Sequence, residues 1–521
     1  MNFNAEIQIA TLSRYINILT RSANDPGITA HYIDKFFNLY QPLLAFEALE
    51  ERHTGVYLAT IVLKIIHEYG ITEKLNCLTT DNASNNFTMV RHLSSRLFEE
   101  GIEWDYRTQH IPCLAHIINL VVKEFLNNLE EDEEDGFSFL ATLKKIRAIA
   151  KAIRSSPRKW EIFEQCCKSY DIRPMTIPLD IAVRWNATYR MLEQAVYLRR
   201  PIRRFVEEDD SEMREFQLSE EEWDLAEVLL VFLMPFKRCT TRFECNSTTP
   251  EIDYVFFAYD KMFNHIEDVK TALSSGASIG VLPCVPFMSK ALDEMELTLK
   301  RYYSKTDLPT VYGDAMILNP RCKLSLFEED TWSEEDAIRY EKSCRNRFQQ
   351  YTTDSTSTNV EVGVMQSDGN GIRDLEFAEM LAKRGTKRRR NDIDRYIDIP
   401  PDPNIKSSLE WWKANHTMFP DLAKFARDVL PVPASGCKVE REFSVSGKIA
   451  MCQRSSLSAS TIANLMMCKS VLRKRPKEAD DIDELPIPEN SGNIPPEWEG
   501  NWWFNKLKRP VRPEISDLFL V

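Results

Sequence analysis

The sequence predicts an α/β domain joined to a large all-helical part. Residues 27–34 and 41–50 have the composition of paired strands, and helical and strand patterns alternate after them to about residue 126. Strands that are first paired and then alternate with helices are typical of an α/β domain. Over residues 190–345, apolar side chains recur almost throughout at helical spacing, with breaks at Pro250 and Pro320.

The N-terminal residues 1–26 carry a mixed pattern. Ile7 and Ile9 alternate as in a strand, whereas Leu12, Ile16 and Leu19 recur as on one face of a helix. Because the two patterns meet within a few residues, we treat this stretch as an atypical N-terminal segment.

The α/β domain continues from Thr54, whose side chain is expected to cap a helix over residues 55–69 that Gly70 ends. A buried strand over residues 76–80 then ends at Asp81. The following elements are a helix to Phe98, a short strand over 106–111 and a helix over 114–126.

The helical part opens with an amphipathic stretch. Its apolar residues lie close to one helical face: Leu140, Leu143, Ile146, Ile149 and Ile153. Residues 353–372, rich in Ser, Thr, Gly and Asp, indicate a mobile loop.

The C-terminal stretch from Leu409 to Arg475 predicts three short amphipathic helices. Pro420 suits a first helical turn, and Ser435 and Ser458 suit the capping positions of two further helices. Together with two adjacent Trp residues, these helices carry more apolar surface than a small bundle buries alone. The stretch is therefore expected to pack against the rest of the chain or against a second copy.

Composition limits the class of protein. The sequence has 521 residues, no apolar run long enough to span a membrane and no signal-peptide pattern, so no membrane partner is expected. Its twelve Cys are scattered without a C-x-x-C motif, which favours reduced thiols in the cytosol or nucleus. A net charge of −13 argues against nucleic-acid binding by the whole surface, so any DNA contact must use local basic patches.

Several motifs in matched order resemble the hAT superfamily of DNA transposases. The C-terminal motifs are Trp411-Trp412, Pro420-x-Leu422-Ala423, Pro433-Ala434-Ser435 and Glu440-Arg441-x-Phe443-Ser444, with Val439 in place of the usual Ser. The N-terminal ones include AHYID, TTDNASNN, C-x-A-H and D-x-x-x-R-W-N from Asp180. This resemblance implies a ribonuclease-H-like core interrupted by a large helical insertion and completed by a C-terminal dimerisation region.

The resemblance also sets the domain boundaries that we predict. They are an atypical N-terminal segment (1–26), the first part of the core (27–190), the all-helical insertion (191–350), an acidic and basic linker (351–408), the dimerisation region (409–475) and a Pro/Trp-rich tail (476–521).

The resemblance implies that Asp81 and Glu440 are the second and third carboxylates of a catalytic triad that holds Mg²⁺. Carboxylate oxygens are the ligands that two-metal phosphoryl transfer needs. Read without the family, Asp81 is a helix cap and Glu440 a solvated helix residue paired with Arg441 or Lys438. The family's first carboxylate lies in a D-x-W-T-S strand, and counting back from the family motif reaches Tyr15, where no such motif occurs. Residues 7–19 are expected to occupy that strand's place without the carboxylate, so the chain is not expected to be a working transposase.

Other candidate residues concern zinc and DNA. Cys113 and His116 could supply two zinc ligands, but no second pair completes a site, so we expect them in the core around the active site and expect no zinc. Arg184 and Trp185 suit phosphate contact and base stacking, or alternatively a core Trp beside an Arg–Asp180 ion pair. A basic run, Lys387, Arg388, Arg389 and Arg390, suits nuclear import or phosphate binding. The family's N-terminal BED-type zinc finger has no counterpart pattern.

The expected function is that of a nuclear, hAT-transposase-derived protein that pairs with itself and associates with DNA. Its expected dimerisation residues are Trp411, Trp412, Leu422, Phe425, Phe443 and Leu465. One alternative is a fragment or mis-spliced copy of an active cut-and-paste transposase, and a second is a protein-interaction module without a DNA role.

Overall fold

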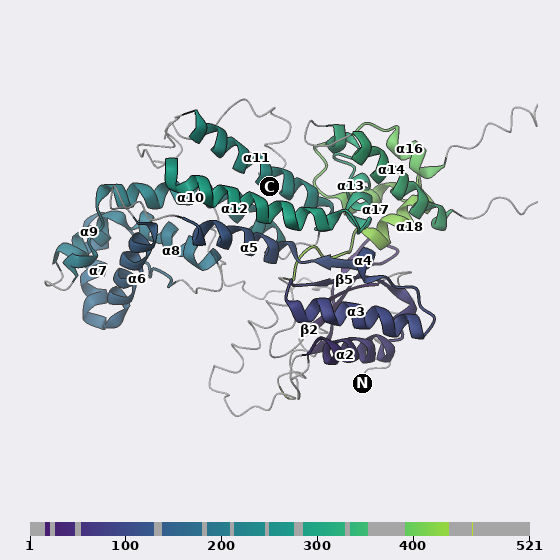
Figure 1. The fold of residues 1–521 in the computed structure, drawn as a ribbon, viewed down its shortest axis with the longest axis horizontal. Helices are drawn as coiled ribbons and strands as arrows, with labels where there is room; N and C mark the ends of the chain where they lie inside the picture. Colours follow the sequence, from purple (N-terminus) through teal and green to yellow (C-terminus); the bar gives the residue numbers. More distant parts are fainter. Residues whose placement is uncertain are drawn as a thin grey trace, which may run out of the picture.

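A computed structural model describes most of the chain. The described residues are 16–20, 27–46, 54–129, 138–179, 185–208, 213–244, 249–275, 285–328, 334–352, 391–436 and 461. This part is mostly helical, with one sheet at one end of an elongated arrangement of helices (Figure 1).

Six strands form a mixed sheet in the order β3-β2-β1-β5-β6, with β4 also paired to β2. The strands are β1 (Ile16–Thr20), β2 (Gly27–Ile33), β3 (Leu39–Tyr40), β4 (Leu43–Phe46), β5 (Leu75–Thr80) and β6 (His110–Pro112). In β1, Ile18 lies opposite Ala30 of antiparallel β2 and opposite Leu78 of parallel β5. Of the stretch 7–19 that we expect in a central strand position, residues 16–19 lie in β1, and residues 7–15 lie outside the described residues.

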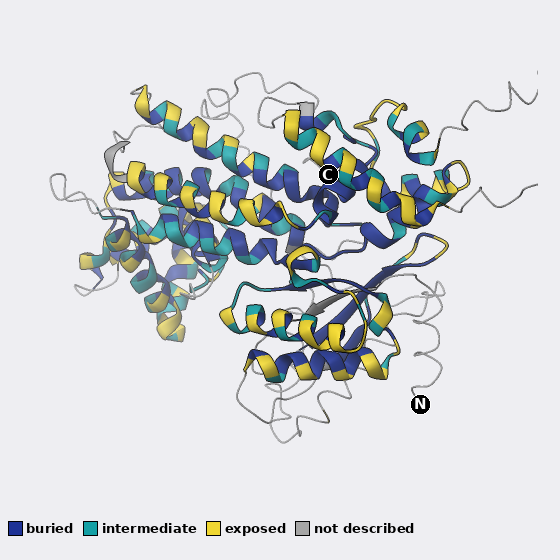
Figure 2. Cartoon of the chain, turned by 45° about the vertical axis from the view of Figure 1, so that its right-hand side comes forward, coloured by how far each residue is buried: buried dark blue, intermediate teal, exposed yellow. Residues whose placement is uncertain are grey.

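Helices cover both faces of the sheet. Alternation along β2 sends Ile28, Ala30 and Tyr32 into one apolar core and Ile33 into another, as the two-residue repeat of a strand requires. The first core contains α2 (Gly55–Glu68) and α3 (Ser84–Glu99), and the second contains α5 (Leu114–Asn127). Figure 2 shows the buried sides of these helices turned inward. Helix α5 thus packs on one face of the sheet and also contacts α12 in the helical part.

The ends of α2 follow the sequence prediction. The N–H of Tyr57 donates to the Thr54 hydroxyl at 3.3 Å, and Gly70 adopts a φ of +60° after the last turn. At the N-terminus of α2, a Cβ placed on Gly55 would lie 2.4 Å from the backbone oxygen of Asn85. Glycine at this position therefore allows α2 and α3 to approach closely.

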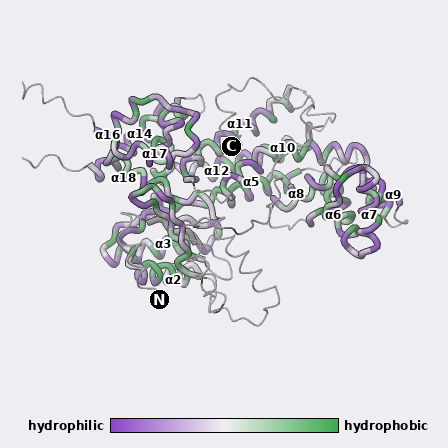
Figure 3. Tube along the Cα trace, turned by 180° about the vertical axis from the view of Figure 1, so that it is seen from behind, coloured by the Kyte–Doolittle hydropathy of each residue, from purple (hydrophilic) through white to green (hydrophobic). Residues whose placement is uncertain are grey.

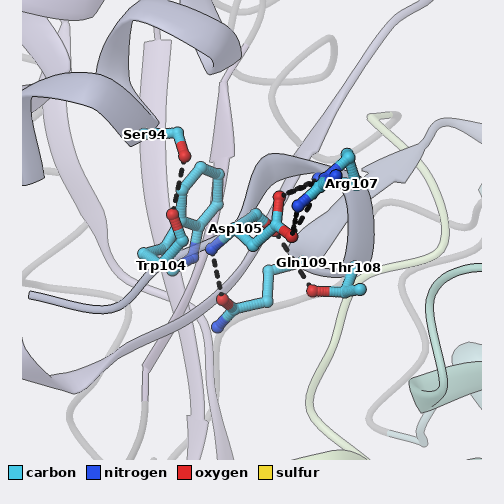
Figure 4. A network of polar contacts seen from close by, with 6 residues as sticks. All are labelled: Ser94, Trp104, Asp105, Arg107, Thr108 and Gln109. Atoms are coloured by element: carbon cyan, nitrogen blue, oxygen red, sulfur yellow. Dashed lines mark hydrogen bonds and ion pairs between the residues drawn. The ribbon is translucent and has the colours of Figure 1, made fainter. Parts of the chain in front are cut away.

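The strand predicted over residues 106–111 is only half correct. Residues Tyr106–Gln109 form a helical turn, α4, because Asp105 caps it by accepting a hydrogen bond from the N–H of Arg107. The Asp105 N–H donates to Gln109 Oε1 at 2.9 Å, and the Ser94 hydroxyl donates to the Trp104 carbonyl at 2.7 Å (Figure 4). This network fixes the connection from α3 so that β6 enters the sheet parallel to β5.

From α5 to residue 429, every regular element that the structure describes is a helix. The α-helices are α6 (Phe139–Ser155), α7 (Pro157–Ser169), α8 (Trp185–Tyr197), α9 (Arg199–Glu208), α10 (Glu220–Glu244), α11 (Val255–Ser274), α12 (Val285–Tyr303), α13 (Val311–Ile317), α14 (Glu334–Phe348), α16 (Asp392–Ile397), α17 (Ser408–Asn415) and α18 (Pro420–Val429). The 3-10 turns are Thr72–Lys74, Arg214–Phe216, Ile252–Tyr254, Ser304–Thr306, Ser325–Glu328 and Gln349–Tyr351. The predicted breaks at Pro250 and Pro320 are confirmed, since both lie between helices. In α6, Leu140 is exposed instead of lying with the other predicted core residues.

The C-terminal helices α16, α17 and α18 pack against the chain's own helical part. The indole N–H of Trp412 donates to the Leu318 carbonyl at 2.9 Å, and the Ser408 hydroxyl donates to Asp253 Oδ2 at 2.8 Å. Trp412, Leu422 and Phe425 are fully buried, whereas Trp411 is half-buried. Their burial is explained within one chain, so a role of these residues in self-association stays a prediction. Phe443 and Leu465 lie outside the described residues.

Candidate functional site

The candidate site lies at the carboxyl ends of three parallel strands. Strands β1, β5 and β6 run parallel, and Asp81 directly follows β5 as Cys113 follows β6. In open α/β sheets, this edge is where ligands bind. Polar residues of the TTDNASNN run gather here.

Asp81 lies in the short connection between β5 and α3, which begins at Ser84. Its Oδ1 accepts hydrogen bonds from the Ala83 N–H at 3.0 Å and from the Asn86 side-chain amide at 2.7 Å. The interpretation of Asp81 as the cap of α3 is therefore wrong, because these bonds reach the residue before the helix and a side chain, and no side chain caps α3. The buried side-chain amide of Asn82 and the Oδ1 of Asn86 have no hydrogen-bond partner among the described residues. Buried polar groups without a partner are uncommon, so these atoms mark a place where a further polar group would fit.

Strand β6 supplies a second polar residue. His110 Nε2 lies 2.8 Å from Thr80 Oγ1, and burial lowers the pKa of His110 to about 4, with the charge of Lys305 as a smaller cause. His110 is therefore neutral at pH 7 and acts as a hydrogen-bonding group beside Asp81. The sequence analysis missed this residue. Its only signal was a polar side chain at the start of a short apolar run, HIPCLAH.

The C-terminal part of the chain reaches the same edge. The Thr79 hydroxyl donates to the Pro433 carbonyl at 2.7 Å, and the Leu114 N–H donates to the Ala434 carbonyl at 2.9 Å. The Gly436 N–H lies 3.0 Å from Cys113 Sγ, and the Cys113 N–H donates to the Thr80 carbonyl at 2.8 Å. Cys113 is therefore a buried hydrogen-bonding residue next to the site. His116 lies in the first turn of α5 and is half-buried.

A two-metal centre for Mg²⁺ requires several carboxylates that converge on one place. Among the described residues, no group of three or more His, Cys, Asp or Glu side chains could hold a metal ion. Strand β1, which lies beside β5, reads Ile-Asn-Ile-Leu-Thr and contains no carboxylate. Asp81 already uses one carboxylate oxygen to accept two hydrogen bonds. The residues that the structure describes here do not fit a two-metal centre, and Glu440 lies outside them.

Trp185 differs from the base-stacking prediction. Its side chain is 2% exposed at the start of α8 and packs edge-on against Tyr189, with ring centres 6.0 Å apart. Its backbone N–H lies 3.3 Å from Asn119 Oδ1 on α5. A buried ring cannot stack on a base in this conformation, so the core position of Trp185 is confirmed, while the ion pair of that alternative stays a prediction. Asp180, Arg184 and the basic run Lys387–Arg390 lie outside the described residues.

A cleft of about 1010 Å³ lies at the other end of β5. It is lined from the α/β part by residues such as His67, Leu75 and Gln109, and from the helical part by Thr310 and Arg347. Because it opens at the amino end of β5, it is separate from the edge that holds Asp81.

No helix among the described residues is long and apolar enough to span a bilayer.

Known protein families match the sheet, the helical part and the C-terminal helices of this chain. A ZBED1 RNase-like domain matches residues 27–103, a ZBED1 RNase-like helical domain matches residues 111–232, and the hAT family C-terminal dimerisation region matches residues 392–472. The chain belongs to the hAT family of transposase-like proteins.

Similar proteins cover most of this chain. A protein of Talaromyces stipitatus named as a transcriptional regulator, tpeD, is 30% identical over 88% of this chain and 53% of its own length. A protein of Zea mays named as an AC transposase is 26% identical over 85% of this chain and 54% of its own length. The zinc finger BED domain-containing protein DAYSLEEPER of Arabidopsis thaliana is 23% identical over 85% of this chain and 61% of its own length. The chain thus spans little more than half the length of these relatives.

Proposed function

We propose that this chain is a hAT-transposase-derived protein that associates with itself and with DNA in the nucleus and does not catalyse strand transfer. Its core corresponds to the ribonuclease-H-like domain of the family, with the helices from α6 onward as the insertion. The names of the relatives support this proposal, because they include a transcriptional regulator, a transposase and a BED zinc-finger protein.

The observation that carries the catalytic part is the composition of β1. This strand occupies the place between β2 and β5 where the resemblance puts the first carboxylate, and it contains none. Gly436 contacts Cys113, and Glu440 is only four residues further along, so the chain is long enough to bring a second carboxylate near Asp81. Two carboxylates without a third bind metal weakly, and phosphoryl transfer depends on that metal.

The filled position of β1 also bears on the alternative that the chain is a piece of an active transposase. That alternative needs another strand, with a carboxylate, at the same position in the sheet. Because β1 already pairs with both neighbours over Ile16–Thr20, an additional strand would have to displace it. This favours a defective site over one that upstream residues complete.

The test is a nicking and strand-transfer assay on duplex DNA ends with Mg²⁺ or Mn²⁺, using the unchanged chain and Asp81→Ala. The proposal predicts no product from either protein. Metal-dependent product from the unchanged chain that disappears in Asp81→Ala would overturn it, because another group would then complete the site.

The self-association part rests on the match of residues 392–472 to the hAT dimerisation region. Sedimentation velocity of the full chain over a range of concentrations tests it. A species of twice the chain mass at micromolar concentration supports the proposal, and a monomer throughout the range contradicts it.

A further inference from the structure

A strongly basic face on α6 stands out in a chain whose net charge is −13. Between Ser138 and Trp160 the sequence contains seven Lys or Arg residues and neither Asp nor Glu. The seven are Lys144, Lys145, Arg147, Lys151, Arg154, Arg158 and Lys159. Helices α6, α7 and α9 lie together at the end of the molecule away from the sheet (Figures 1 and 3), so this charge is remote from Asp81.

The structure divides α6 into an apolar side and a basic side. Its apolar side is buried, including Leu143, Ile146 and Ile153. Lys144, Lys151 and Arg154 are seven and three residues apart, a spacing that places them on one side of a helix. All three are exposed. At 1.5 Å per residue, this basic face extends for about 15 Å along the axis.

The cations of this face have no acidic partner among the residues that the structure describes. Lys144, Lys151 and Arg154 form no ion pair or side-chain hydrogen bond within the part of the chain that the structure describes. Arg158, exposed at the start of α7, extends the unpaired charge around the corner between the two helices. The exception on α6 is Lys145, which points to the other flank and lies 2.8 Å from Glu222.

Helix α9 provides the comparison within the same molecule. It is also rich in Arg, but Arg199 pairs with Glu220, Asp224 and Glu227, and Arg203 also pairs with Glu220. Arg204 pairs with Glu208 at 2.6 Å. Within the described residues, carboxylates thus neutralise Arg199, Arg203 and Arg204 of α9, whereas Lys144, Lys151 and Arg154 of α6 repel one another unless an anion binds.

We infer that the exposed face of α6, defined by Lys144, Lys151 and Arg154, binds the phosphate backbone of duplex DNA. This inference rests on the DNA association proposed above and assigns it to a site that no motif indicated. Each strand of duplex DNA carries a phosphate about every 3.4 Å along the axis, so a straight face of about 15 Å faces several of them. A convex helix surface without a cleft suits contact with phosphates and not with base edges, so the binding is independent of sequence.

A membrane is the less suitable partner for this face. Helices that lie in a bilayer surface bury their apolar side in lipid, whereas the apolar side of α6 is already packed inside the protein. An acidic protein segment remains as a competing partner, and the experiment separates it from DNA.

The test is fluorescence anisotropy of a labelled random-sequence 20-base-pair duplex with the full chain, between about 50 and 200 mM salt. The stripe variant is Lys144→Gln/Lys151→Gln/Arg154→Gln. The matched control is Lys261→Gln/Lys342→Gln/Lys413→Gln, which removes three exposed cations on α11, α14 and α17 and changes the net charge equally. Circular dichroism checks that all three proteins melt alike.

We expect the stripe variant to raise Kd by roughly tenfold or more and to lower the salt slope, −dlogK/dlog[salt], by about 2.7 for three lost phosphate contacts. The control is expected to match the unchanged chain.

Three outcomes overturn the inference. Equal binding by the stripe variant and the unchanged chain places the DNA contact elsewhere, while the proposed DNA association survives. Equal weakening by the control shows an effect of net charge alone. No binding by the unchanged chain, or binding of a fluorescent poly-glutamate peptide in place of DNA, overturns both the inference and the proposed DNA association.

Discussion

Replacing Trp412 by Ala should destabilise the single folded chain and not only an interface between copies. The indole is fully buried, its N–H donates to the Leu318 carbonyl at 2.9 Å, and its ring lies 5.1 Å from Tyr396 and 5.0 Å from Trp411. Truncating a buried aromatic side chain typically costs about 3–5 kcal/mol because it leaves a cavity. The substitution also leaves the buried Leu318 carbonyl without its donor. We include this cost in the range of about 3–5 kcal/mol, because partial collapse of the site reduces the cavity.

Two further variants separate packing from hydrogen bonding. Trp412→Phe keeps an aromatic ring and removes the N–H, so it should cost about 1–2 kcal/mol. Lys413→Ala, on the exposed side of the same helix, should change stability by less than about 0.5 kcal/mol. This order of effects follows from the contacts of each side chain.

Urea unfolding followed by far-UV circular dichroism measures these differences. It should be done at several protein concentrations, because a loss of dimer lowers stability only where the unchanged chain is dimeric. The account predicts that the deficit of Trp412→Ala persists at the lowest concentration. An unchanged midpoint for the diluted variant, together with a shift from dimer to monomer, would refute it and assign Trp412 to the interface.

Three other predictions follow from local geometry. Gly55→Ala should cost about 1–3 kcal/mol, since its Cβ would meet the Asn85 carbonyl at 2.4 Å, while Val56→Ala on the exposed side is a nearly neutral control in the same urea titration. Asp81→Ala should cost about 1 kcal/mol because it removes the hydrogen bonds that Oδ1 accepts from the Ala83 N–H and the Asn86 amide, and an unchanged midpoint would contradict that role. Burial raises the pKa of the Asp253 carboxyl from 3.8 to about 6. The folded state therefore binds the carboxyl proton more tightly than the unfolded state does, and the free energy of unfolding falls as pH rises from about 4 to 6. Asp253→Asn should therefore gain up to about 3 kcal/mol over the unchanged chain at pH 7 and nothing at pH 4, and a gain that is independent of pH would count against this cause.

Local patterns were sufficient for several elements. The cap at Thr54, the positive φ at Gly70 and the apolar repeat of α5 depend on neighbours within a few residues, so the sequence alone indicated them. The Asp81 side chain likewise bonds to residues only two and five positions away, but it does not cap α3 as the sequence indicated.

Elements decided by distant contacts could not be predicted in the same way. Strand β1 showed a mixed pattern because its pairing with β2 and β5 decides its conformation. The turn α4 depends on the Asp105 carboxylate, whose pKa is lowered chiefly by its hydrogen bond to Arg107. The apolar surface of α17 and α18 left two solutions open, a second copy or the rest of the chain. The contacts of Trp412 on α17 with Leu318 and of Phe425 on α18 with Phe348 show that the chain itself buries this apolar surface.

The central claim is that the family fold is kept without the family's metal site. Calorimetric titration of Mn²⁺ into the full chain and into Asp81→Ala tests it directly, since binding does not depend on finding the right DNA. The account predicts identical titrations with no saturable site. Saturable binding of two Mn²⁺ per chain that Asp81→Ala abolishes would contradict it.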